Sequence, residues 1–210
     1  MTGSMAKVAV LASGSGTNLQ ALIDACGTSQ LSAHIVAVVT DNPDAGAIAR
    51  AHAAQIPTIV VSRQKDETRS DYDLRLAQAV RDTRADVVVL AGFMRLLSMN
   101  FLAHFPMRVI NLHPALPGEF PGVHAIERAF AERDVKGRTH SGVMVHFVPD
   151  EGVDNGPVIA SRQVPILKSD TLDTFTQRMH ETEHELIVLA VQKVIQSDLH
   201  HLMYPEELTP

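Results

Sequence analysis

One run of residues, Asp86–Ala91, constrains the fold more than any other feature of the chain. It reads Asp-Val-Val-Val-Leu-Ala, so every residue after the aspartate is apolar. An unbroken apolar run suits a strand that is covered on both faces, and such strands belong to parallel sheets with helices on either side. Residues 7–12 and 34–40 carry similar runs. We therefore expect an α/β protein.

Helical stretches separate these runs along the first half of the chain, where Leu19, Leu22 and Ile23 recur at helical spacing. The expected strands are residues 7–12, 34–40, 58–61, 86–91 and 108–112, and the expected helices are residues 17–25, 45–54, 70–83 and 99–105. This alternation predicts a doubly wound sheet flanked by helices, with a ligand site at the carboxyl ends of its strands.

The second half of the chain predicts a different arrangement. Residues 141–147 and 157–164 read as two strands joined across the turn 149–152. Such a short connection indicates an antiparallel pair, so the mostly parallel sheet should end in an antiparallel C-terminal strand. A helix is expected over 125–133, and a long final helix over 171–196 with Asp170 as its N-cap.

No long linker rich in Pro, Gly or Ser divides the 210 residues. Residues 1–210 are therefore expected to form a single domain. Residues 1–4 precede a second methionine, Met5, and residues from about 197 to 210 are expected to form a tail.

Composition excludes several classes of function. The formal charge of −6 argues against a general nucleic-acid binder. No apolar run approaches the ~20 residues of a membrane span, and the N-terminus lacks the pattern of a secretory signal. The single cysteine, Cys26, allows no internal disulfide and favours a reducing compartment. We expect a cytoplasmic protein without nucleic-acid or membrane partners, and the sequence leaves a homodimer open.

A glycine loop, Ser-Gly-Ser-Gly-Thr-Asn at residues 13–18, lies between the first expected strand and helix. Backbone N–H groups at a helix N-terminus favour an anion, and Thr17 and Asn18 can add side-chain hydrogen bonds. No Gly-Lys-Ser/Thr follows, and the third glycine of a dinucleotide fingerprint is missing. A phosphate site and a plain tight turn with a helix cap both stay open.

Three polar residues form a candidate catalytic set. Asn111 and His113 are two apart in a strand, so they point to the same side of the ligand edge. Asp154 lies in a later loop that can return to that edge. Asn111 can stabilise an oxyanion, His113 titrates near neutral pH, and Asp154 can orient the histidine or accept a proton. Each residue alone is also common as a cap, structural or turn residue.

The sequence resembles the glycinamide ribonucleotide transformylases of purine synthesis over nearly its whole length, from Met5 to about Ile195. The segments that carry the resemblance are residues 10–20, 86–97, 110–114 and 145–157. The resemblance implies a Rossmann-like formyltransferase fold and transfer of a formyl group from 10-formyltetrahydrofolate, as co-substrate, to the amine of 5'-phosphoribosylglycinamide. It implies no metal.

The resemblance also assigns roles by position. Asn111, His113 and Asp154 match the family's catalytic residues, and His146 looks like a supporting residue near Asp154. The positions that match the folate site are Arg69, Met94, Arg95, Leu96, Leu97 and Asn111, with the loop from Asp150 to Asp154 on the other side. Those that match the phosphorylated substrate's site are Gly16, Thr17, Asn18 and Glu183.

One departure from the family pattern is visible after Pro114. The family usually continues Ser-Leu-Leu-Pro, whereas this chain has Pro117 and Gly118 where the family has its second Leu-Pro pair. The backbone path of this loop is therefore open.

Methionyl-tRNA formyltransferase carries an additional C-terminal domain, for which the chain lacks the length. Formyltetrahydrofolate deformylase usually carries an N-terminal regulatory domain, whereas this chain begins at its first strand.

The segment His180–His184 matches the His-Glu-x-x-His zinc motif. On a helix its two histidines would share a face, and Glu206 or Glu207 could supply a third ligand. The doubly wound pattern does not suit a zinc protease, so a chance match is favoured, and the pair His200 and His201 is expected in a solvated tail.

A folate or nucleotide binder without catalysis is the third class of function considered, after a transferase and a zinc hydrolase. Such a binder would not need all three catalytic residues.

Overall fold

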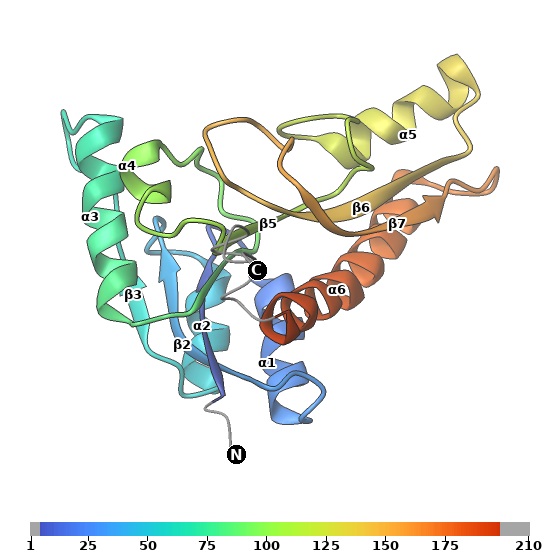
Figure 1. Cartoon of the computed structure of the whole chain (residues 1–210). Coiled ribbons are helices and arrows are strands. Elements are labelled where there is room, and N and C mark those ends of the chain that lie inside the picture. The colour runs from blue at the N-terminus through green and yellow to red at the C-terminus, as the bar shows by residue number, and fades with distance from the viewer. Residues whose placement is uncertain (1–4, 198–210) are drawn as a thin grey trace, which may run out of the picture.

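The computed structural model describes residues 5–197. Its helices and strands, in chain order, are β1 (Ala6–Leu11), α1 (Thr17–Gly27), β2 (Ala33–Thr40), α2 (Gly46–Ala53), β3 (Thr58–Val60), α3 (Arg69–Asp82), β4 (Val87–Leu90), α4 (Met99–Leu102), β5 (Val109–His113), α5 (Ala125–Lys136), β6 (His140–Phe147), β7 (Val158–Pro165) and α6 (Leu172–Gln196) (Figure 1). Every element that the sequence predicts is present, with ends shifted by at most a few residues.

Within residues 5–197, seven strands form one sheet in the order β3-β2-β1-β4-β5-β6-β7. The pairs from β3 to β5 are parallel, whereas β6 runs antiparallel to both β5 and β7. The predicted doubly wound sheet with an antiparallel C-terminal end is therefore confirmed. The chain winds outward from β1 to β3 and then returns to β4, so the order reverses between β1 and β4. Ligands of such sheets bind in the crevice at this reversal.

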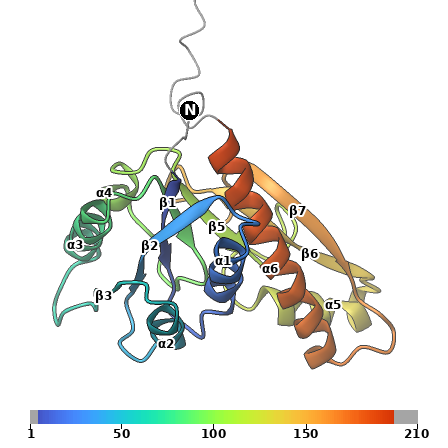
Figure 2. The ribbon, with the colours of Figure 1, turned by 90° about the horizontal axis from the view of Figure 1, so that it is seen from below.

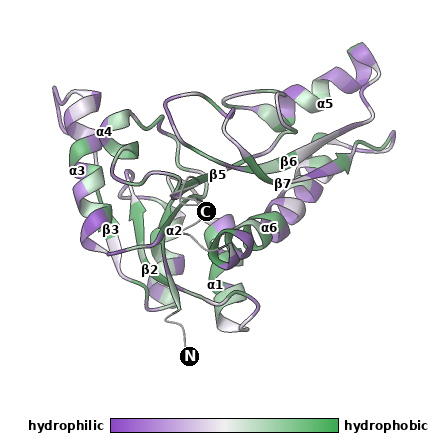
Figure 3. Cartoon of the chain, viewed as in Figure 1, coloured by the Kyte–Doolittle hydropathy of each residue, from purple (hydrophilic) through white to green (hydrophobic). Residues whose placement is uncertain are grey.

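Alternate residues of each central strand pack into two different cores. In β1, Val8 and Val10 pack with buried residues of α1, α2 and α6. Ala9 and Leu11 point the other way and pack with buried residues of α3 and α4. Helices thus cover both faces of the sheet (Figure 2). The strands are mostly hydrophobic along their length, while the covering helices keep hydrophilic outer stretches (Figure 3). This double cover explains the unbroken apolar run in β4.

The N-cap of α6 differs from the prediction. Thr171, not Asp170, caps the helix, because its side chain accepts a hydrogen bond from the backbone N–H of Thr174 in a capping box. The carboxylate of Asp170 pairs instead with Arg178 at 2.8 Å and accepts the N–H of Leu167. Asp170 and Thr171 are both good cap residues, so the side-chain type alone could not separate them.

None of the helices among residues 5–197 is both long and apolar enough to cross a membrane.

Candidate active site

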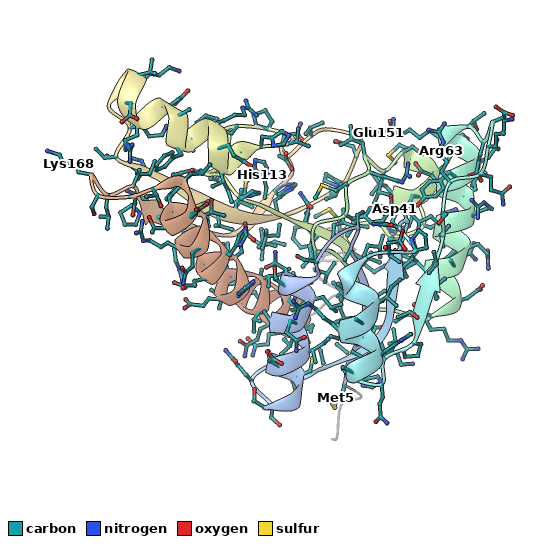
Figure 4. All side chains as sticks on the ribbon, turned by 180° about the vertical axis from the view of Figure 1, so that it is seen from behind. Met5, Asp41, Arg63, His113, Glu151 and Lys168 are labelled. Atoms are coloured by element: carbon teal, nitrogen blue, oxygen red, sulfur yellow. The ribbon has the colours of Figure 1, made fainter. Side chains whose placement is uncertain are left out.

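Asn111 and His113 lie at the carboxyl end of β5, on the same side of the strand. The antiparallel register sets Asn111 opposite His146 of β6. Both Asn111 and His113 line one cavity, as the period of two along a strand predicts. Figure 4 shows His113 and Glu151, another residue of that cavity, both in the upper half of the molecule.

The carboxylate of Asp154 reaches both residues from the loop that follows β6. Its Oδ1 accepts a hydrogen bond from Asn111 Nδ2 at 3.1 Å, and its Oδ2 lies 3.3 Å from His113 Nδ1. The backbone N–H of Gly122 donates to the same Oδ2 at 2.8 Å. Asp154 adopts a left-handed backbone conformation, with φ of 51°. The structure therefore brings the three predicted residues together, although Asp154 lies 43 residues after Asn111 in the sequence.

His146 supports this group from β6. Its Nδ1 lies 2.8 Å from the carbonyl oxygen of Phe147, so Nδ1 carries the proton of the neutral ring. The other nitrogen, Nε2, lies 3.3 Å from Asn111 Nδ2 and 3.6 Å from Asp154 Oδ1. His146 is buried and can orient the amide of Asn111, which agrees with the supporting position expected from the sequence.

Both ring nitrogens of His113 face hydrogen-bond acceptors. Nδ1 faces Asp154, and Nε2 lies 3.1 Å from the carbonyl oxygen of Phe120. Burial lowers the pKa of His113, and this effect outweighs the acceptors, which favour the charged ring. His113 is therefore mainly neutral near pH 7 before substrate binds, and a second proton would find a partner on either side.

The pKa of Asp154 results from opposing effects. Burial raises it, but the neighbouring His146 ring, the hydrogen bond from the Gly122 amide and the nearby His113 lower it below its usual range. Asp154 therefore stays ionised at neutral pH, which allows it to orient His113 and to stabilise a positive charge on that ring.

A cavity of about 730 Å³ opens beside these residues. One wall is the segment Gly92–Leu97 after β4, and the opposite wall is the loop Asp150–Asp154. Leu90, Leu112 and Val148 make its floor largely apolar, and Asn111, His113 and Asp154 form its polar end. This size and lining suit a flat heteroaromatic ligand with a few directed polar groups.

The expected folate residues divide between this cavity and a smaller hollow next to it. Met94, Arg95 and Leu96 line both, and Leu97 lines the large cavity alone. Arg69 lines the smaller hollow of about 300 Å³. Its Nε donates to the carbonyl oxygen of Leu96 at 3.2 Å, and its guanidinium pairs with Glu151. Arg69 thus joins the two walls at the cavity's edge.

The glycine loop and Glu183 form a second polar region. Gly16 adopts φ of 74° and precedes α1, whose first turn has neither a side-chain cap nor an acidic residue of its own. Asn18 donates from Nδ2 to Glu183 Oε2 of α6 at 3.1 Å, and both side chains are buried. Burial raises the pKa of Glu183, against the effect of Asn18. The structure thus places Glu183 beside the loop rather than among the residues of the large cavity.

The loop after Pro114 takes a path that sequence alone left open. Glu119 N–H donates to Leu116 O in a turn, and Gly118 has φ of 79°. After this turn, the Phe120 carbonyl oxygen lies within hydrogen-bond distance of His113, and the Gly122 N–H donates to Asp154. These two contacts could not be predicted from the sequence, because backbone groups carry no signal of residue type.

The His-Glu-x-x-His segment lies on α6. Its Glu183 is hydrogen-bonded to Asn18, as described above, and burial lowers the pKa of His184. Within residues 5–197, no group of three or more His, Cys, Asp or Glu side chains is placed to hold a metal ion. The segments with His200, His201, Glu206 and Glu207, like residues 1–4, lie outside the described residues.

The fold and this site define an α/β enzyme whose polar residues suit attack at a carbonyl carbon: an amide donor, a titratable imidazole and an ionised carboxylate. The formyl transferase family model matches residues 6–191. The chain therefore belongs to the formyl transferase family.

Individual relatives agree over most of the chain. The phosphoribosylglycinamide formyltransferase of Dictyostelium discoideum is 43% identical, over 88% of this chain and 96% of its own. The protein of that name from Escherichia coli (strain K12) is 39% identical, over 88% and 84%. The crystal structure of phosphoribosylglycinamide formyltransferase from Bacillus halodurans superposes with a TM-score of 0.84 at 35% identity, covering 93% of this chain and 98% of that one.

Proposed function

We propose that this protein transfers the formyl group of 10-formyltetrahydrofolate to the amine of 5'-phosphoribosylglycinamide, a step of purine (IMP) biosynthesis. The observation that carries the proposal is the double contact of Asp154 with Asn111 and His113 at the polar end of the cavity. Family membership and the names of the relatives support the choice of substrates.

The substrates fit the two regions of the site. The folate lies along Met94–Leu97, where the apolar cavity can take its ring system. The phosphate of the amine substrate lies at the open N-terminus of α1, in the loop Gly14–Asn18, where backbone N–H groups and the helix dipole favour it. Glu183, beside Asn18, then contacts the same substrate.

The reaction needs no covalent intermediate on the protein. The amine nitrogen forms a bond to the formyl carbon, the bond from that carbon to the folate nitrogen breaks, and one proton of the amine moves to the folate nitrogen. When substrate binds, one N–H of Asn111 Nδ2 turns from its partner in the site to the formyl oxygen and stabilises the negative charge that develops there. That charge also favours a proton on His113, and the ionised Asp154 stabilises the imidazolium and assists proton movement.

The compartment, the domain organisation and the oligomeric state of the protein are also matters of proposal. We propose that the protein acts in the cytoplasm, as one domain spanning its 210 residues. Whether two copies pair as a homodimer is a separate prediction, which sedimentation analysis can test.

The test is release of tetrahydrofolate from 10-formyltetrahydrofolate, with and without phosphoribosylglycinamide. We expect release only when the amine is present. Equal release without the amine would indicate a hydrolase instead. Binding without release in either mixture would indicate a folate-binding protein, and metal-dependent peptidase activity would indicate a zinc enzyme.

A further inference from the structure

Asp41 follows the end of β2 and has no role in the proposed chemistry, yet each of its carboxylate oxygens accepts a hydrogen bond. Ser13 Oγ donates to Asp41 Oδ1 at 2.6 Å, and Arg95 Nε donates to Asp41 Oδ2 at 2.7 Å. Ser13 Oγ also accepts the backbone N–H of Met94 at 2.9 Å. Asp41 is therefore linked by two routes, one through Ser13 and one through Arg95, to Met94–Leu97, the segment along which the folate is proposed to lie and which we call the folate wall.

These contacts are protected from solvent. The Asp41 side chain is 11% exposed, so its pair with Arg95 is screened less than a surface ion pair. The guanidinium carbon of Arg95 also lies 4.8 Å from the ring centroid of the buried Tyr72. Asp41 and Tyr72 together fix the guanidinium of Arg95. Figure 4 shows Asp41 in the same upper right region of the molecule as Arg63, which lines the smaller hollow with Arg95.

Apolar packing holds the two ends of this wall, at Phe93 and Leu97, but not its middle. Met94 is 70% exposed and Leu96 is 58% exposed, so apolar packing cannot fix these two residues. Polar contacts are then the main restraint on residues 94–96: Met94 N–H to Ser13, the Arg95 side chain to Asp41, and Leu96 O to Arg69. Segments with few buried contacts are the ones that open locally.

We propose that Asp41 is a positioning residue for the folate, acting through Ser13 and Arg95 to hold the backbone of Met94–Leu97 in its binding geometry. The inference rests on the proposed function, in which the folate lies along this segment. Ser13 also directly precedes the phosphate loop, so the same aspartate lies between the two substrate regions. Its two side-chain contacts, however, both lead to the folate wall.

The test compares four variants of the full chain: Asp41→Asn, Asp41→Ala, Ser13→Ala and the double variant of the last two. Calorimetry measures the Kd for tetrahydrofolate, and steady-state assays measure KM for each substrate. Asp41→Ala should weaken tetrahydrofolate binding by about tenfold, the effect of losing a charge-assisted hydrogen bond. Asp41→Asn should lose less, because its amide oxygen can still accept from Ser13.

Two further readouts separate positioning from a general loss of stability. The KM for phosphoribosylglycinamide should stay within about threefold in Asp41→Asn, since its contacts with Ser13 persist. The double variant should lose little more than Asp41→Ala alone, because residues in one network are not additive. Asp134→Asn removes an exposed ion pair with Arg133 on α5 and is the matched control, expected to change neither constant.

An unchanged Kd for tetrahydrofolate in Asp41→Ala would overturn the inference and leave the proposed function standing. So would equal losses for both substrates in Asp41→Asn, or full additivity in the double variant. If the unsubstituted protein binds no tetrahydrofolate at all, the proposed function fails first and this inference with it.

Discussion

Glu183 is a buried carboxylate that faces one hydrogen-bond donor, Asn18, across the gap between α1 and α6. Burial raises its pKa, which means that the ionised form costs stability at neutral pH. A buried charge that weakens the fold and lies beside a ligand loop is typical of a residue kept for binding.

Glu183→Gln should therefore separate stability from function. The amide removes the buried charge but keeps an oxygen that can accept from Asn18, so Tm should stay the same or rise. The KM for phosphoribosylglycinamide should increase by about tenfold or more, as expected when a charged hydrogen bond to substrate is lost. Thermal unfolding and steady-state kinetics measure the two effects. Glu185→Gln, on the exposed face of the same helix, is the control. A lower Tm with unchanged KM would contradict this account of Glu183.

Gly16 supplies a backbone conformation that few other residues tolerate. Its φ is 74°, and a Cβ built there would lie 2.8 Å from the backbone Cα of Ala47. The sequence predicted a tight loop here but could not reveal this contact with the start of α2, because the two residues are far apart in the chain.

Gly16→Ala should lower the free energy of unfolding by more than about 1 kcal/mol, because it combines an unfavourable φ with a backbone clash. It should also weaken binding of the phosphorylated substrate, whose loop it displaces. Urea unfolding and KM give the two values. Gly27→Ala is the control in the same helix, since a Cβ there meets nothing within 4 Å and its φ is not positive. Equal stabilities for the two variants would argue against strain at Gly16.

Among the helices and strands, the N-cap of α6 allows a test of fold stability that does not depend on the proposed reaction. Thr171 closes the capping box, and the helix that it begins carries Glu183. Thr171→Ala should cost about 1 kcal/mol of stability, a fall in Tm of roughly 2–4 °C for a chain of this size. The turnover number should not change, because Thr171 lies about three helical turns before Glu183. An unchanged Tm would show that another contact, such as Asp170 with Arg178, fixes this end of the helix.

The strands and helices could be predicted from the sequence because each is either long or bounded by turn residues. Apolar runs of β-branched residues predicted β1, β2 and β4, and helical spacing predicted α1. The sequence could not decide between Asp170 and Thr171 as the cap. The choice depends on Arg178, which lies eight residues after Asp170 and forms an ion pair with it in the fold.

The candidate site could be predicted only in part. The position of Asn111 and His113 followed from strand periodicity, and Asp154 needed the family resemblance as well. The contacts that complete the site come from the Phe120 carbonyl, from the Gly122 N–H and from the link between Ser13 and Asp41. Backbone groups have no residue type, and Asp41 begins the run Asp-Asn-Pro-Asp at residues 41–44, a composition typical of a turn.

At the scale of the whole molecule, the sheet order explains where the two substrate regions lie. The glycine loop follows β1 and the folate wall follows β4, on either side of the reversal in strand order. The next strand, β5, adds Asn111 and His113 at the same edge. The antiparallel strand β6 then returns the chain, so that its following loop brings Asp154 back to β5.

Stability should depend on pH through His113. Its folded pKa lies below the value near 6.5 of an unfolded chain, so the unfolded state binds more protons between these two values. Stability that is present above about pH 6.5 is therefore lost as the pH falls towards the folded pKa. Asp154 adds a loss of the same sign at lower pH, because its folded pKa lies below its unfolded value.

Urea unfolding of the unsubstituted protein and of His113→Gln between pH 7.5 and 5 measures this effect. The stability advantage of His113 over glutamine should shrink as the pH falls, and the comparison cancels the opposite contribution of Glu183. An advantage that grows on acidification would mean that the folded state binds the proton more tightly, contrary to the burial of His113.

The proposed role of Asn111, His113 and Asp154 is in formyl transfer rather than in support of the fold. Single-turnover transfer from 10-formyltetrahydrofolate to phosphoribosylglycinamide tests it most directly, with tetrahydrofolate binding measured on the same samples. His113→Ala should lower the rate by about a hundredfold or more while it still binds tetrahydrofolate, because the loss falls on the transition state. A near-native rate in a folded His113→Ala protein would remove His113 from the chemistry and contradict the account.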